Sequence, residues 1–112
     1  MTEENVKITG TFLGREDHGI FTCQLHISGD SWGCAFGGYS LDTYDQKKKD
    51  RVGTAYGMDF INSILETLEV SEWEKLPGTY CRVRLEDRKV IEIGHLIKPK
   101  WFNPKLLSKE GT

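Results

Sequence analysis

The sequence lacks a membrane-spanning run, an excess of basic residues and a secretory signal. None of its 112 residues belongs to an apolar run near the ~20 residues that cross a bilayer. Lysine and arginine together number 15, against 17 aspartates and glutamates, which gives a net charge of −2. This balance argues against a general, charge-driven coat of nucleic acid, although it leaves room for a local basic patch, and the missing apolar run argues against a membrane partner. Because the N-terminus is acidic and polar, we expect a cytoplasmic protein.

Catalytic and metal-binding patterns are also missing from the sequence. The three cysteines, Cys23, Cys34 and Cys81, show no C-x-x-C spacing and lie in apolar runs, which predicts buried, reduced thiols. The three histidines are scattered, so we expect neither a metal site nor a cofactor. No Ser-His-Asp order, H-E-x-x-H or Walker motif occurs. A non-enzymatic protein is therefore the leading hypothesis.

Hydrophobic periodicity predicts five strands. Along residues 5–13, Val6, Ile8 and Phe12 fall on one side of an alternating pattern. Such alternation is typical of a sheet with one buried and one solvated face, which favours antiparallel pairing. The predicted strands cover residues 5–13, 21–28, 32–41, 79–85 and 90–97.

A single long helix is predicted over residues 55–69. Its apolar residues recur at helical spacing, and Thr54 suits an N-cap. The element order is β-β-β-α-β-β, so we expect an α+β fold: a mostly antiparallel five-stranded sheet with one main helix packed on one face.

We expect one domain over residues 1–112, with frayed termini at 1–4 and 108–112. The polar residues 42–53 predict an exposed, mobile loop. The aromatic tail after residue 100 either packs on the core or docks on a second subunit. A homodimer is therefore one of the two alternatives that the sequence allows.

Two groups of residues are candidate sites. The first is the loop-to-helix junction, where a helix N-terminus, a glycine and basic side chains could bind a nucleotide or another anion. The second is the solvated sheet face, where aromatic and basic side chains could bind a partner protein. The junction comprises Lys48, Lys49, Arg51, Gly53 and Thr54, and the face comprises His26, Tyr39, Tyr80, Arg82 and Arg84.

Three segments carry a resemblance to known sequences: residues 36–42 (FGGYSLD), residues 51–57 (RVGTAYG), and residues 93–95 with 101–102 (IGH and WF). With these segments the chain resembles a family of small uncharacterised proteins encoded by bacteriophages and prophages, from about Val6 to Leu107. The resemblance implies an accessory protein in the cytoplasm of a bacterial host. It assigns no functional residue.

The leading hypothesis is a non-enzymatic, phage-encoded binding protein. It would inhibit a host protein, such as a CRISPR or other defence protein, by covering its functional surface. The alternative is a nucleotide-binding sponge, or a binder of small anionic ligands, that uses the loop 47–54 and the helix N-terminus.

Overall fold

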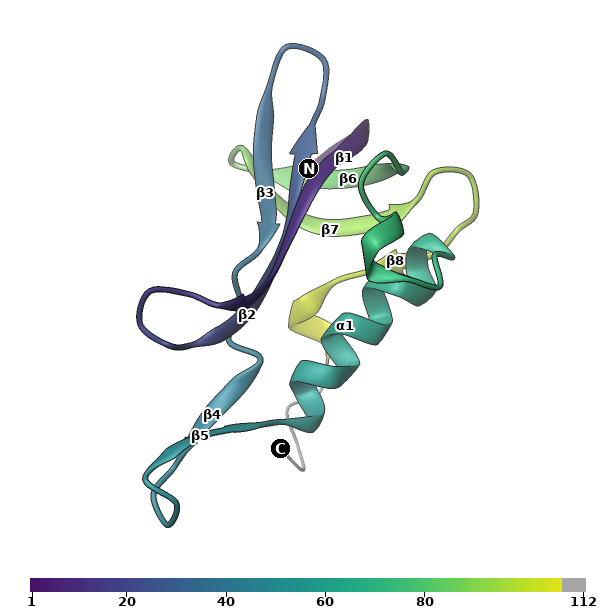
Figure 1. The fold of residues 1–112 in the computed structure, drawn as a ribbon. Coiled ribbons are helices and arrows are strands. Elements are labelled where there is room, and N and C mark those ends of the chain that lie inside the picture. Colours follow the sequence, from purple (N-terminus) through teal and green to yellow (C-terminus); the bar gives the residue numbers. More distant parts are fainter. Residues whose placement is uncertain (108–112) are drawn as a thin grey trace.

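Strands are the main regular structure of the chain, and one long helix accompanies them (Figure 1). The computed structural model describes residues 1–107. The strands are β1 (Thr2–Arg15), β2 (Phe21–Ser28), β3 (Gly33–Gly37), β4 (Asp42–Asp45), β5 (Asp50–Gly53), β6 (Tyr80–Glu86), β7 (Lys89–His95) and β8 (Trp101–Phe102). The helices are α1 (Ala55–Leu68) and two 3-10 turns, η1 (Trp73–Lys75) and η2 (Pro104–Leu106).

One antiparallel sheet holds six strands in the order β3-β2-β1-β6-β7-β8. The 14-residue β1 joins its two halves, because its first part pairs with β6 and its second part with β2. The α+β class and the antiparallel sheet are confirmed, but the predicted five strands are wrong. The additional strand is β8, in the predicted tail, where Phe102 pairs with Ile93 and Trp101 with Gly94.

A β-bulge interrupts β1, and the side chains beyond it take the opposite face of the sheet from the one predicted. The register with β2 shifts between Ile8 and Gly10, so one extra residue stands in β1 at this point. Val6 and Ile8 are buried as expected. Beyond the bulge Thr11 takes the inner face, where its Oγ1 accepts a hydrogen bond from Trp73 Nε1 at 3.1 Å. Phe12 is therefore turned to the outer face, where it is 39% exposed.

The helix α1 covers one face of the sheet, as predicted. Its buried residues include Tyr56, Phe60 and Ile64. The Phe60 ring lies 5.1 Å from the Phe102 ring and 6.4 Å from the Phe36 ring, so β3, β8 and the helix share one core. The helix ends where Glu69 adopts a left-handed backbone with φ 56°. Within residues 1–107, no helix is long and apolar enough to cross a membrane.

Two predictions about irregular segments are wrong. Residues 42–53 are an antiparallel hairpin of β4 and β5. The N-terminus is paired from Thr2 onward, with Thr2 opposite Leu85 and Glu4 opposite Val83, so residues 2–4 are not frayed. The prediction for residues 108–112 lies outside the described residues.

Candidate interaction surface

The β4–β5 hairpin projects from the body of the molecule, and we call residues 42–53 the arm (Figure 1). Asp42 pairs with Gly53 at its base, and Asp45 with Asp50 near its tip. The Asp45 carboxylate closes the turn, because its Oδ1 accepts hydrogen bonds from the backbone N–H groups of Lys47 and Lys48 at 2.8 and 3.2 Å. The arm therefore has a defined turn.

The tip of the arm combines positive charge with an exposed aromatic ring. Lys47, Lys48 and Lys49 are all exposed, and no ion pair within residues 1–107 involves them. Tyr44 precedes them and is 49% exposed. Tyrosine is a frequent anchor of protein interfaces, and unpaired surface charge steers association with a complementary surface.

A pair of hydrogen-bonded charges ties the base of the arm to the body. Arg51 donates from Nη2 to Asp42 Oδ1 at 2.7 Å and from Nε to Asp42 Oδ2 at 2.9 Å, which is a bidentate pair. The Phe21 N–H donates to the same carboxylate at 3.2 Å. The hydrogen bond from Arg51 is the main reason why the pKa of Asp42 is lowered. The Asp42 side chain is only 7% exposed, so this link fixes the arm against β2.

The structure does not bring the predicted anion-binding residues to one point. Lys48 and Lys49 lie at the tip of the arm, whereas Gly53 and Thr54 lie at its base. Arg51 is between them, and its charge is compensated by Asp42.

The N-terminus of α1 already has a hydrogen-bonding partner. Thr54 Oγ1 accepts from the Gly57 N–H at 2.9 Å, which makes Thr54 the predicted N-cap. The same hydroxyl donates to the Leu41 carbonyl at 2.8 Å. A Cβ at Gly57 would overlap that carbonyl, so the first turn of α1 packs directly on the backbone before β4.

The outer sheet face carries an arginine–tryptophan cluster of Arg82, Arg84 and Trp101. The guanidinium carbons of Arg82 and Arg84 lie 4.6 and 3.8 Å from the centroid of the Trp101 ring. Trp101 lies over Gly94, where an added Cβ would overlap the ring. The alternation in the sequence predicts the two arginines on this face, whereas Trp101 lies in the segment predicted as a tail.

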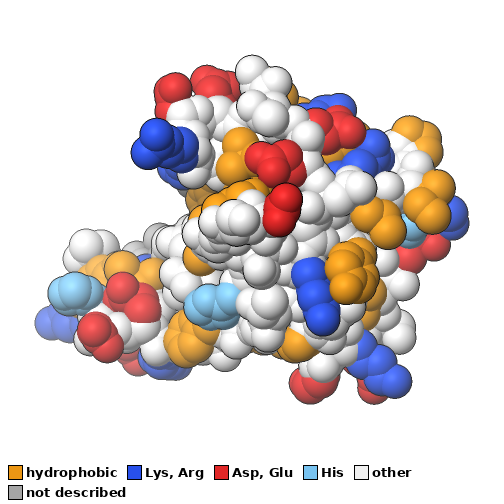
Figure 2. Space-filling view, turned by 90° about the horizontal axis from the view of Figure 1, so that it is seen from above, with side chains coloured by type: hydrophobic (Ala, Val, Ile, Leu, Met, Phe, Trp, Pro, Cys, Tyr) orange, Lys and Arg blue, Asp and Glu red, His pale blue; other side chains and the backbone are white. Residues whose placement is uncertain are grey.

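Both arginines of the cluster are held by contacts within the chain. Arg82 donates to the carbonyls of His95 and Lys98 at 2.7 and 2.8 Å. Arg84 forms an ion pair with Glu92 at 3.2 Å, and Glu3 lies 3.3 Å from Arg82 and 3.5 Å from Arg84. The face is therefore of mixed charge, and Figure 2 likewise shows basic and acidic side chains interspersed on the side that it views.

The remaining predicted face residues separate into two groups. Tyr80 is 58% exposed, with Lys7 Nζ 5.6 Å from its ring centroid, and His26 is exposed beside Gly10. Tyr39 is not on this face. Its ring lies 5.3 Å from the Phe60 ring on the helix side, because Gly37 and Gly38 take positive φ values of 119° and 83° and turn the chain there.

No reactive thiol or metal cluster is found among residues 1–107. Burial raises the pKa of Cys23 and of Cys81 to about 12, and it also raises the pKa of the half-buried Cys34. A thiol with a raised pKa is a poor nucleophile at neutral pH. In the same part of the chain, no three His, Cys, Asp or Glu side chains are grouped so that they could hold a metal ion.

No known protein family, curated protein or solved structure matches this chain.

Proposed function

We propose that this protein is a non-enzymatic binding protein that covers a functional surface of a partner protein. The observation that carries the proposal is the arm: a projecting hairpin, fixed at its base by Arg51 and Asp42, with unpaired lysines and Tyr44 near its tip. A fixed base reduces the entropy lost when the arm is ordered against a partner.

The charge of the tip indicates the chemistry of the partner. The whole chain has a net charge of −2, so the three adjacent lysines form a local positive region on an acidic protein. Such a region favours contact with an acidic protein surface and speeds association with it. The outer face adds Tyr80 and the arginine–tryptophan cluster as a second contact area. The resemblance to phage-encoded proteins adds that the partner is a bacterial host protein, such as a CRISPR or other defence protein.

The alternative, binding of a nucleotide or another small anion by residues 47–54, has less support. Arg51 is neutralised by Asp42, and Thr54 already caps the helix. An anion would therefore meet only the exposed lysines at the tip.

Charge reversal at the tip tests the proposal. In affinity capture from a bacterial extract, Lys48→Glu/Lys49→Glu should retain a bound host protein about tenfold less well than the parent chain, because like charges then face the acidic surface. The control, Lys75→Glu/Lys105→Glu, makes the same change in charge at two other exposed lysines and should bind normally. Equal retention by both variants would contradict the proposal.

A further inference from the structure

The six-stranded sheet is curled, and its inner face lines a cavity at one end. Cα atoms of β3 and β7 lie within 8 Å of each other, although three strands separate these two in the sheet order. The cavity has a volume of about 440 Å³, and its lining comes from the starts of β1 and β3, the end of β6 and the β6–β7 turn. Ligand sites in proteins are commonly of this size, and the mouth of a curled sheet is one of their usual places.

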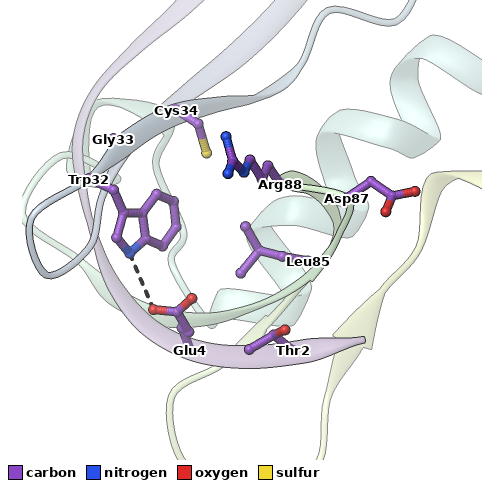
Figure 3. Close-up of a pocket in the computed structure, with 8 residues that line it drawn as sticks. All are labelled: Thr2, Glu4, Trp32, Gly33, Cys34, Leu85, Asp87 and Arg88. Carbon is purple, nitrogen blue, oxygen red and sulfur yellow. Dashed lines mark hydrogen bonds between the residues drawn. The ribbon is translucent and has the colours of Figure 1, made fainter.

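The inner-face strands give this cavity largely apolar walls. In Figure 3 the Trp32 ring and the Leu85 side chain point into the same space, and the Cys34 thiol lies beside them. The indole is held in place, because Trp32 Nε1 donates a hydrogen bond to Glu4 Oε1 at 3.2 Å. Glu4 itself pairs with the buried Val83, so its side chain lies on the inner face of the sheet. A fixed indole beside a leucine offers a flat apolar surface that suits a planar ring.

Arg88 adds a positive charge to the cavity. Its side chain extends from the β6–β7 turn into the space near Cys34 (Figure 3). Within residues 1–107 its guanidinium forms no ion pair and no hydrogen bond. Burial raises the pKa of Cys34, so the neighbouring thiol is neutral at physiological pH and does not compensate the charge. Arg88 takes this position with a positive φ of 65°, and such strained residues cluster at ligand-binding sites.

The two carboxylates of the lining leave the charge of Arg88 available. The Asp87 carboxylate points away from the cavity, and the Glu4 carboxylate lies across the space from the guanidinium (Figure 3). Neither carboxylate forms an ion pair with Arg88 in the part of the chain that the structure describes. The cavity therefore combines apolar walls with one cationic end and one acidic end.

We propose that this cavity binds a small planar aromatic ligand that carries a single carboxylate group. The ring lies against Trp32 and Leu85, and the carboxylate accepts two hydrogen bonds from the Arg88 guanidinium, whose planar fork matches it. A second negative charge on the ligand is disfavoured, because Glu4 lies across the cavity. The site goes beyond the proposed binding of a partner protein, since none of its residues belongs to the arm.

Three naphthalene compounds of similar size and different charge test the site on the parent chain. At neutral pH naphthoate is an anion, naphthamide is neutral and naphthylmethylamine is a cation. In NMR titrations, naphthoate should shift the indole N–H signal of Trp32 with a Kd below about 1 mM, and the other two should bind at least about tenfold less well. Equal binding of the three compounds, or no shift of the Trp32 signal, would overturn the inference.

Substitution of Arg88 tests the role of its charge. Arg88→Glu should reverse the preference, so that naphthylmethylamine binds at least about tenfold more tightly than naphthoate. Arg88→Gln removes the charge and adds none, so it should bind naphthoate and naphthamide about equally. The control, Arg15→Glu, makes the same change in charge at an exposed arginine outside the lining and should keep the preference of the parent chain. An unchanged preference for naphthoate in Arg88→Glu would overturn the inference.

Discussion

At the scale of single residues, the β6–β7 turn holds two side chains in an unfavourable backbone conformation. Asp87 and Arg88 have φ values of 52° and 65° and connect Glu86 to its pairing partner Lys89. Positive φ at both central positions matches the right-handed twist of the strands, but only glycine adopts it without steric cost. Arginine at this position is strained, and its side chain lines a cavity together with Cys34 and Leu85 (Figure 3).

Arg88→Gly should therefore stabilise the protein. Glycine relieves the steric cost of the positive φ, and this effect outweighs the larger conformational entropy that glycine gives to the unfolded chain. The free energy of unfolding should therefore rise by about 0.5–1 kcal/mol. Urea unfolding measures this as a higher midpoint. As the control, Lys89→Gly lies in β7 with no positive φ and should destabilise by about 0.5–1 kcal/mol. A lower midpoint for Arg88→Gly would show that its side chain forms contacts that outweigh the strain.

The sheet face on which a side chain lies was predictable where apolar and polar residues alternate without interruption. It was not predictable where the backbone changes direction. Tyr80, Arg82 and Arg84 lie in the uninterrupted strand β6, and all three face outward as predicted. Tyr39 follows two glycines with positive φ, and its side chain therefore reaches the helix side. Glycine pairs indicate a bend, but the direction of the bend depends on the packing that surrounds it.

At the scale of elements, the end of α1 is tied to the segment between β7 and β8. The Glu69 carboxylate forms ion pairs with Lys98 Nζ at 2.8 Å and Lys100 Nζ at 3.2 Å, and His95 Nε2 lies 4.0 Å away. Hydrogen bonds from Lys98 and Lys100 lower the pKa of Glu69 to about 2. This contact links residues at the end of the helix to the strands that the helix covers.

The lowered pKa of Glu69 predicts a pH-dependent contribution to stability. A carboxyl whose folded pKa is depressed stabilises the folded state above its ordinary pKa, near 4.5, and loses that effect as the pH falls through its folded pKa of about 2. The difference in urea midpoint between the parent chain and Glu69→Gln should therefore be largest above pH 5 and vanish near pH 2. It should also shrink in 1 M salt. A difference that does not change with pH would contradict this account.

Elements defined by hydrophobic periodicity were predictable, and those defined by long-range pairing were not. The spacing of Ile61, Ile64 and Leu68 identified α1 within one residue of its observed end. The arm has polar residues on both faces of its strands, so its sequence has the composition of a loop. Its base is fixed by Asp42 and Arg51, nine residues apart in the chain. The bulge after Ile8 cannot be recognised from the alternation of apolar and polar residues, because its position depends on the pairing of β1 with β2.

At the scale of the whole molecule, the extents are 47 × 29 × 27 Å, and the arm lies at one end of the body (Figure 1). The α+β class was predictable, since the order of strands and helix implied an antiparallel sheet covered on one side. The sixth strand was not predictable, because a two-residue strand carries no periodicity. The arm is a separate two-stranded sheet, and β3 lies at the end of the six-stranded sheet. The sequence alone specifies neither of these arrangements.

The most direct test of the central claim is site-specific photo-cross-linking through the arm. A benzophenone amino acid replaces Tyr44, and in the control it replaces Ile97, which is 82% exposed and lies outside the arm. After irradiation in a bacterial extract, position 44 should yield one discrete cross-linked host protein, and position 97 should not. Lys48→Glu/Lys49→Glu should remove the product from position 44. The absence of a discrete product at position 44, or the same product in equal yield from position 97, would contradict the claim that the arm binds a partner.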